Sequence, residues 1–341
     1  MKEKALTDIS VLILFHARPN YFSKVWEEVK KAKPTRLFLY QDGPRDEKDM
    51  PGIMACRELV DDEQINWECE IHRLYQNKNY GCDPSEFISQ RWAFSLTNKC
   101  IVLEDDDVPS QSFFLFCKEM LDRYENDERI EIISGFNTDS QTTDIEGGAD
   151  YFFTRNFAIS GWASWSRVVN RWDGNYDFVK NPKTLALLKT KAAKYKQRSN
   201  LVQMCIDHAS IGKEFYETIF WADMMLHDGL AIMPRLNQIN NIGLDSGTHY
   251  SAQVQLPKRI RKMFATPRHE LQFPLTHPKE VKEHPAYQER CYLLNAWDHP
   301  WRKMQYSAEE LWLNLIHGNF GTISDAIINR IKKTLGKKKY C

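Results

Sequence analysis

The sequence predicts an α/β protein with a Rossmann-like mixed sheet flanked by helices and a helical C-terminal extension. Three observations support this fold class. Short apolar runs without a helical period, such as residues 11–15 and 100–103, are typical of buried strands in a parallel sheet. Segments with amphipathic helical spacing alternate with these runs, as in βαβ units. Polar residues follow several of the strands, at the ends where open α/β sheets bind ligands.

The composition is that of an ordinary globular protein, with 341 residues of which 42% are hydrophobic and 27% charged. Lys and Arg total 46, as do Asp and Glu, so no overall charge attracts nucleic acid. Eight cysteines without a Cys-x-x-Cys pair favour reduced thiols over a disulfide framework or a zinc site. No apolar signal segment and no run of about 18 apolar residues is found. We therefore expect a soluble or peripheral, cytoplasmic protein.

The elements of the first half follow one another at short intervals. After the strand at 11–15, residues 21–33 place Phe22, Val25, Trp26 and Val29 on one helical face, and Pro34 ends that helix. The remaining predicted elements before residue 135 are strands at 37–40, 67–73, 100–103 and 130–134 and helices at 50–59, 84–97 and 112–124.

The second half begins with a polar loop at 138–150 and an aromatic-rich segment at 151–172. We interpret most of these rings as core packing, although one or two aromatic faces would suit the wall of a sugar site. Helical segments at 181–208 and 220–225, a strand at 230–234 and a glycine-bearing loop at 241–249 follow.

The tail is predicted to be helical and to end in basic residues. Ser307 and Glu310 form a capping box before residues 311–313, and Gly318 would end that helix. A helix at 324–335 would follow, with its isoleucines on one stripe. This helix could lie on an anionic membrane surface or pack on its own domain. We therefore expect two parts, an α/β domain at residues 1–250 and a largely helical C-terminal extension with a basic end at residues 251–341.

Four adjacent carboxylates, Glu104 to Asp107, follow the strand at 100–103. Each charge disfavours ionisation of its neighbours. A hard divalent cation among the oxygens would relieve this repulsion, and Mg²⁺ or Mn²⁺ suits carboxylate ligands and substrate phosphates. The alternative is a solvated acidic turn that caps the next helix.

The sequence contains neither Gly-x-Gly-x-x-Gly after the first strand nor a Gly-Lys-Ser/Thr loop, which argues against dinucleotide cofactors and P-loop hydrolysis. The acidic strand end resembles the Asp-x-Asp signature of GT-A glycosyltransferases, in which a divalent metal bridges the diphosphate of a sugar nucleotide. The order of motifs over residues 9–250 further resembles the N-acetylglucosaminyltransferase I family of inverting GT-A enzymes and its bacterial relatives. The resemblance implies the GT-A nucleotide-diphospho-sugar transferase fold.

The resemblance also assigns roles to individual residues. The motif Glu104-Asp105-Asp106 is similar to the family's Glu-Asp-Asp, whose last aspartate binds the metal, and the loop 245–249 is similar to the one that closes over the diphosphate. The implied metal ligand is Asp106, with His249 as a candidate further ligand, and our candidate general base is Asp223. The implied donor-binding residues are Arg18, Asp42, Lys78, Gly81, Arg91, Glu104, Asp105, Trp162, Trp221 and Ser246. The chain departs from the family at Ala222, where an aspartate usually follows the tryptophan.

The resemblance implies an inverting, Mn²⁺- or Mg²⁺-dependent glycosyltransferase, a hexosyl- or N-acetylhexosaminyltransferase. It would move a sugar from a UDP-sugar to a glycan or glycolipid acceptor in bacterial surface polysaccharide synthesis, with possible peripheral membrane contact through the C-terminal helix. Two alternatives stay open. A nucleotidyltransferase also uses aspartates at strand ends, although residues 16–19 lack the Gly-rich basic loop that a triphosphate needs. A catalytically inactive sugar-nucleotide or glycan-binding module would be consistent with Ala222.

Overall fold

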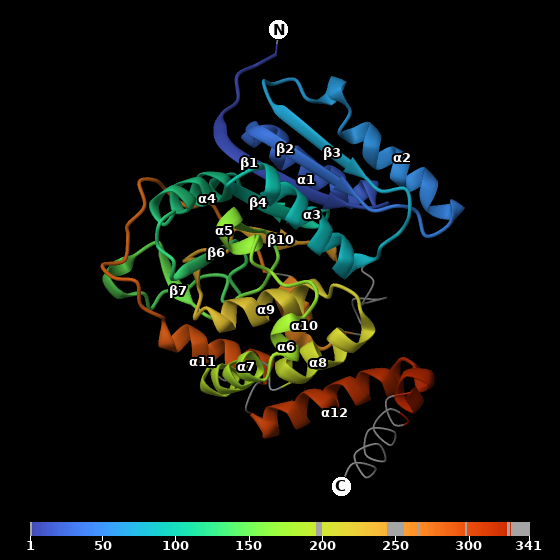
Figure 1. The fold of residues 1–341 in the computed structure, drawn as a ribbon, viewed down its shortest axis with the longest axis vertical. Helices are drawn as coiled ribbons and strands as arrows, with labels where there is room; N and C mark the ends of the chain where they lie inside the picture. The colour runs from blue at the N-terminus through green and yellow to red at the C-terminus, as the bar shows by residue number, and fades with distance from the viewer. Residues whose placement is uncertain are drawn as a thin grey trace.

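A computed structural model of the chain describes residues 2–195, 200–243, 256–264, 266–296, 299–325 and 328. Its main feature is an eight-stranded mixed sheet with the order β3-β2-β1-β4-β8-β6-β9-β7 (Figure 1). The strands are β1 (Thr7–Phe15), β2 (Pro34–Gln41), β3 (Glu70–Tyr75), β4 (Lys99–Glu104), β6 (Ile130–Ser134), β7 (Tyr151–Thr154), β8 (Trp162–Trp165) and β9 (Leu230–Pro234). This architecture confirms the predicted Rossmann-like α/β fold class.

The first half of the sheet is parallel and the second half is mixed. Strands β3, β2, β1 and β4 run parallel to one another. Strand β8 lies antiparallel between β4 and β6, β9 pairs in parallel with β6, and β7 closes the edge antiparallel to β9. Strands β7 and β8 come from the aromatic-rich segment, for which the sequence did not predict strands.

Alternate residues of each central strand enter two separate hydrophobic clusters, one on each face of the sheet. In β4, Ile101 and Leu103 join the cluster formed with α1, α2 and α4, whereas Cys100 and Val102 join the cluster formed with α3, α7, α8 and α9. Because both faces of the strands are covered, the apolar runs in the sequence are continuous. The helices are α1 (Pro19–Ala32), α2 (Met50–Leu59), α3 (Cys82–Leu96), α4 (Gln111–Arg123), α5 (Ser166–Val169), α6 (Asp177–Lys180), α7 (Pro182–Lys194), α8 (Leu201–Ile211) and α9 (Tyr216–Leu226).

A small second sheet adjoins the acidic end of β4. Strand β5 (Asp107–Pro109) pairs antiparallel with β10 (Ile239–Asn241), which places Asp107 opposite Asn241. The pairing joins the segment after β4 to a segment more than a hundred residues later in the chain. Ile242, which follows β10, is held beside the acidic turn, because its amide donates to the Asp106 carbonyl at 2.9 Å.

The C-terminal segment is largely helical, as predicted, with α10 (Lys258–Phe264), α11 (Pro285–Asn295) and α12 (Pro300–Ile316). Part of it packs against the main sheet, because Leu271 and Leu275 belong to the first hydrophobic cluster. The boundary at residue 250 stays a prediction. The expected capping box is wrong, since α12 begins at Pro300, a favoured first helical residue, and Ser307 lies inside the helix. The helix predicted at 324–335 falls almost entirely outside the described residues.

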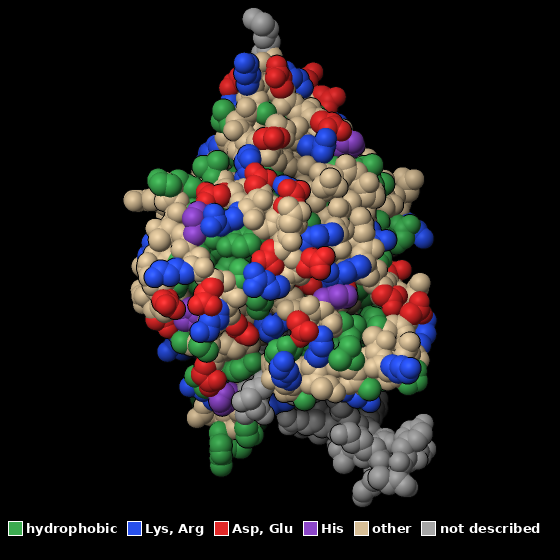
Figure 2. All heavy atoms as spheres, turned by 60° about the vertical axis from the view of Figure 1, so that its left-hand side comes forward, with side chains coloured by type: hydrophobic (Ala, Val, Ile, Leu, Met, Phe, Trp, Pro, Cys, Tyr) green, Lys and Arg blue, Asp and Glu red, His purple; other side chains and the backbone are tan. Residues whose placement is uncertain are grey.

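The surface carries both signs of charge. Figure 2 shows Lys and Arg interspersed with Asp and Glu across the face in view, as the balanced composition predicts. Among the helices that the structure describes, none has the length and apolar character needed to cross a bilayer.

Candidate functional site

The register of the parallel strands brings three strand ends to one edge of the sheet. Leu14 of β1 pairs with Tyr40 of β2 on one side and with Glu104 of β4 on the other. Strand β2 lies on one side of β1 and β4 lies on the other, so the strand order reverses direction at β1. Such a reversal is a topological switch point, where open α/β sheets bind ligands. A cavity of about 940 Å³ lies at this edge, and among the residues that line it are Arg18, Asp42, Gly81, Glu104, Asp105 and Asp106.

Arg18, which lies between β1 and α1, binds the acidic turn directly. Its guanidinium Nε lies 3.2 Å from Asp105 Oδ2, and its Nη2 contacts Asp105 Oδ1. The same Nη2 lies 3.0 Å from Asp106 Oδ2. The cation therefore bridges the two aspartates that follow β4, which compensates part of their repulsion.

Five carboxyl groups gather around this turn, because Glu86 of α3 joins residues 104–107. Burial, together with the charge of Asp107, raises the pKa of Glu86 to about 8, and burial with the charge of Asp106 raises the pKa of Asp107 to about 8. Burial and neighbouring carboxylates also raise the pKa values of Glu104 and Asp106. Without a cation these carboxyl groups therefore favour their protonated forms, and a divalent cation beside them would favour the ionised forms.

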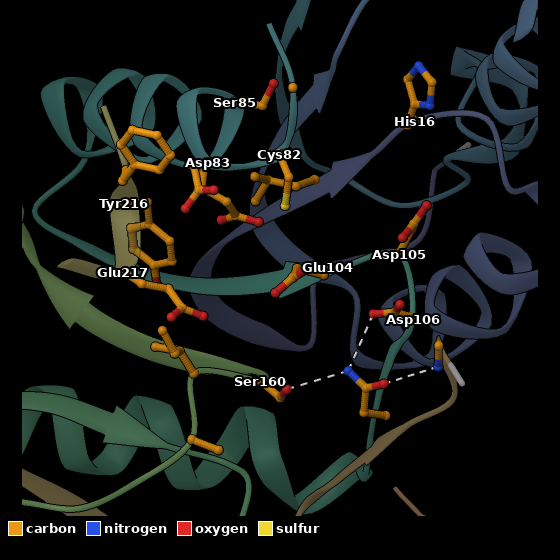
Figure 3. Close-up of a pocket in the computed structure, with 18 of the residues that line it drawn as sticks. His16, Cys82, Asp83, Ser85, Glu104, Asp105, Asp106, Ser160, Tyr216 and Glu217 are labelled. Carbon is orange, nitrogen blue, oxygen red and sulfur yellow. Dashed lines mark hydrogen bonds between the residues drawn. The ribbon is translucent and has the colours of Figure 1, made fainter. Parts of the chain in front are cut away.

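Asp107 and Asp106 have different environments although they are adjacent. Asp107 is fully buried and accepts hydrogen bonds from the Gly161 amide (2.8 Å) and from Asn241 Nδ2 (3.0 Å). Asp106 lines the cavity, with Asn241 Nδ2 3.4 Å from its Oδ1 (Figure 3). A Cβ atom at Gly243 would lie 2.1 Å from Asp106 Oδ2, so a larger residue there would displace the Asp106 carboxylate. Asp107 holds the turn in place, and Asp106 faces the ligand space.

The donor set fits a divalent cation that takes most of its other ligands from a substrate. No group of three or more His, Cys, Asp or Glu side chains in the described ranges is arranged to hold a metal ion. Mg²⁺ commonly needs only one or two protein carboxylates, with water and phosphate oxygens completing its shell. Asp106 and Asp105 line the cavity and supply such oxygens, and a cation beside Asp106 would favour its ionised form. His249, the other predicted ligand, lies outside the described residues, as does Ser246.

Asp42, directly after β2, organises the neighbouring loop. Its carboxylate accepts hydrogen bonds from the amides of Gly43 (2.9 Å), Tyr80 (2.9 Å) and Gly81 (3.0 Å) and from Asn79 Nδ2 (2.9 Å). Asp42 and Gly81 both line the cavity. Asp42 therefore shapes the wall of the cavity through the loop that it holds.

Helix α9 forms the opposite wall. Glu217 and Trp221, four residues apart and thus on one helical face, both line the cavity. Phe157 packs on Trp221 with 4.7 Å between ring centroids. Figure 3 shows Glu217 and Tyr216 on the side of the space opposite Asp105 and Asp106. A carboxylate beside an aromatic wall thus faces the acidic turn across the cavity.

Asp223 lies on the other side of α9. Two residues after Trp221 correspond to a rotation of about 200°, which turns the side chain away from the cavity. Arg171 Nε donates to Asp223 Oδ2 at 2.8 Å, and Arg171 Nη2 contacts the fully buried Glu131. Asp223 is not among the residues that line the cavity. This position argues against its predicted role as the general base.

Three further predicted donor-binding residues lie away from the cavity. Arg91 Nη1 donates to the Val169 carbonyl at 3.0 Å, and Trp162 is buried in the core, where it stacks on Phe94. Lys78 is exposed, and its ammonium lies 4.5 Å from the centre of the Tyr80 ring. The structure therefore brings together Arg18, Asp42, Gly81, Glu104, Asp105, Asp106 and Trp221.

Sequence reasoning missed Glu86, Glu217, Asn241 and Gly243. The four-residue spacing between Glu217 and Trp221 was a usable signal, since it places both on one face of a helix. Glu86 and Asn241 reach the site only through tertiary contacts, and no local pattern marks them.

No protein-family model and no curated protein matches the sequence. Solved structures that resemble the chain include mouse xyloside xylosyltransferase 1, with 13% identity over 66% of this chain and 84% of that one, at a TM-score of 0.35. An active-site mutant of LgtC matches with 10% identity over 84% and 95% of the two chains, at a TM-score of 0.33. A cytidylyltransferase from Leptospira borgpetersenii matches with 11% identity at a TM-score of 0.29, over 49% of this chain and 64% of that one, less than two thirds of its length. At such scores these likenesses carry no argument about what this chain binds or does.

Proposed function

We propose that the protein is an inverting GT-A glycosyltransferase that moves a sugar from a UDP-sugar to a glycan or glycolipid acceptor in bacterial surface polysaccharide synthesis. The proposal retains the resemblance to the N-acetylglucosaminyltransferase I family. One observation carries it: Arg18, Asp42 and the acidic turn converge on one cavity at the carboxyl ends of parallel strands. About 940 Å³ is large for a small-molecule site, which suits a nucleotide sugar together with an acceptor.

In this proposal the donor lies along the edge of the sheet. The uridine would lie near Asp42 and the loop that it holds, with the diphosphate toward Arg18 and Asp106. Asp106 and Asp105 would hold Mn²⁺ or Mg²⁺, which supplies Lewis-acid stabilisation of the charge on the departing UDP. Glu104 would accept hydrogen bonds from hydroxyl groups of the sugar. Arg18 supplies a further positive charge near the leaving phosphate.

We assign the general base to Glu217 rather than Asp223, because Glu217 faces the cavity from the wall opposite the acidic turn. The base would remove the proton of the acceptor hydroxyl as that oxygen attacks the anomeric carbon. The new bond joins the acceptor oxygen to the anomeric carbon, and the bond from that carbon to the phosphate oxygen breaks. A single displacement of this kind inverts the configuration and needs no protein nucleophile.

The test is calorimetric titration of the full chain with a panel of UDP-sugars, with and without Mn²⁺. We expect Mn²⁺ to raise the affinity for at least one UDP-sugar, and Asp106→Asn to abolish that increase. Asp8→Asn is the matched control, since Asp8 is exposed near the start of β1, at the end away from the site. Equal Mn²⁺ dependence in wild type and Asp106→Asn would overturn the proposal.

Product analysis separates the competing functions. A transferase releases UDP slowly from its donor even when water is the acceptor. Release of pyrophosphate from a nucleoside triphosphate would instead identify a nucleotidyltransferase, and binding without any turnover would identify an inactive binding module.

A further inference from the structure

Helix α12 carries a continuous apolar stripe that the described chain leaves exposed. At 100° per residue, six of its seven large apolar residues fall within about 140° of the helix circumference, and Leu313 lies outside this arc. The six residues are Trp301, Met304, Leu311, Trp312, Leu315 and Ile316, and they are 45–75% exposed. Helix α12 lies at the end of the molecule opposite the N-terminus, and hydrophobic side chains protrude from that end in Figure 2 (Figures 1 and 2). Exposed apolar patches of this kind mark sites of interaction.

The other side of α12 is the side attached to the body. Tyr306 donates from its hydroxyl to the Leu293 carbonyl of α11 at 3.2 Å, and the Arg259 guanidinium of α10 lies 4.6 Å from the centre of the Tyr306 ring. The Lys258 amide donates to Glu309 at 2.8 Å. Because these contacts fix the polar side against α10 and α11, the apolar stripe faces away from the protein.

We propose that this stripe docks the protein on an anionic lipid surface. Trp301 and Trp312 lie about 20° apart around the helix, and tryptophan favours the boundary between lipid and water. Arg302 lies about 40° beyond the Ile316 edge of the stripe. Three further basic residues, Lys258, Arg261 and Lys262, are exposed on the adjoining α10. An apolar face with basic flanks is the pattern of helices that lie in the plane of an anionic membrane.

Charge favours lipid over a second copy of the chain. Pairing two stripes would bring Arg302 and the basic α10 of one copy toward those of the other, which is unfavourable. In addition, the sequence of residues 326–341, which continues the chain beyond α12, contains six Lys and Arg and no acidic residue. An anionic surface neutralises both sets of charge.

The position of the stripe relative to the cavity bears on which class of acceptor the protein uses. Met263 of α10 and Leu294 of α11 line the same cavity as the acidic turn, and these two helices carry α12. A membrane bound to α12 would therefore lie near that side of the cavity. This placement, which rests on the proposed function, favours a lipid-linked acceptor over a free oligosaccharide.

The test is co-sedimentation of the full chain with vesicles of phosphatidylcholine alone or of phosphatidylcholine and phosphatidylglycerol in equal parts. We expect binding to the anionic vesicles, much weaker binding to the neutral ones, and at least a tenfold loss of partitioning for Leu315→Glu. Leu115→Glu is the matched control, because Leu115 is an equally exposed leucine on α4 (47% against 45%) and should leave binding unchanged. Circular dichroism checks that both variants fold, and Arg302→Glu, at the position next to the stripe, provides a second test: we expect it to weaken binding to the anionic vesicles.

Three results would overturn the proposal. They are no binding of the wild type to anionic vesicles, equal loss in the Leu115→Glu control, or a wild-type dimer that Leu315→Glu converts to a monomer in light scattering. The assay contains no sugar nucleotide, so its outcome is independent of whether the protein is a transferase.

Discussion

At the scale of single residues, position around α9 decides which carboxylate can act on a substrate. Glu217 and Trp221 share the face that lines the cavity, whereas Asp223 is held by Arg171 on the opposite side. An acid that does not line the cavity is poorly placed to take a proton from an acceptor bound there. The two residues therefore make a discriminating pair of variants.

We expect Glu217→Gln to lower kcat for sugar transfer by about 10²- to 10⁴-fold while UDP-sugar affinity stays within a factor of about three, because only proton removal is lost. Asp223→Asn should chiefly lower stability, since it weakens a partly buried ion pair. Steady-state kinetics and donor titration of both variants provide the measurement. A greater loss of kcat in Asp223→Asn than in Glu217→Gln would restore Asp223 as the base.

At the scale of elements, the cavity depends on a loop that the β2 terminus holds in place. The Asp42 carboxylate accepts hydrogen bonds from the amides of Tyr80 and Gly81. The backbone of Gly43 passes close to the backbone of Lys78. A Cβ atom at Gly43 would lie 2.5 Å from the Lys78 carbonyl carbon and oxygen. Neither backbone segment can yield without moving the loop.

Gly43→Ala should therefore destabilise the protein by about 1–3 kcal/mol and weaken UDP-sugar binding, since the added methyl group separates the β2 terminus from the loop. The matched control is Gly321→Ala, because nothing lies within 4 Å of a Cβ at this helical position. That change should be neutral or stabilise by up to about 1 kcal/mol. Urea unfolding followed by circular dichroism measures both, and equal effects would show that the Gly43 contact is not constraining.

At the scale of the whole molecule, a buried charge network joins the sheet to the helices of its second face. Glu131 of β6 is fully buried, and Arg171, which follows α5, links it to Asp223 of α9. Burial raises the pKa of Glu131 to about 7, although the charge of Arg171 opposes the shift. The native protein consequently binds a proton that the unfolded chain releases at lower pH.

The higher pKa of Glu131 in the native state than in the unfolded state determines how stability depends on pH. Between pH about 4.5 and 7 the native state holds more protons than the unfolded state, so this residue lowers stability as pH rises, by about 3 kcal/mol in total. Glu131→Gln should flatten this part of the profile, whereas Glu63→Gln, at an exposed position, should leave it unchanged. Thermal unfolding at half-unit pH steps measures the slope, and an unaltered slope in Glu131→Gln would contradict the prediction.

Many of the helices and strands could be predicted, because the spacing of apolar residues within each segment indicates its secondary structure. The helix at 50–59 was predicted with the bounds that the structure shows, and the apolar runs before His16 and Glu104 became adjacent strands β1 and β4. Burial on both faces imposes such runs on a central strand. The capping box predicted at Ser307 and Glu310 was wrong, because both residues lie inside a helix that begins at Pro300.

The candidate site, like the fold, could be predicted from the sequence only in part. The sequence alone determined that acidic residues follow a buried strand and that Arg18 and Asp42 follow two others, because strand ends are encoded in neighbouring residues. Only the tertiary structure decided that Glu86 and Asn241 join them, that Arg91 and Trp162 point elsewhere, and that α9 presents Glu217 rather than Asp223. These outcomes depend on how distant segments pack and on the rotation of each helix about its axis, which no local window of the chain specifies.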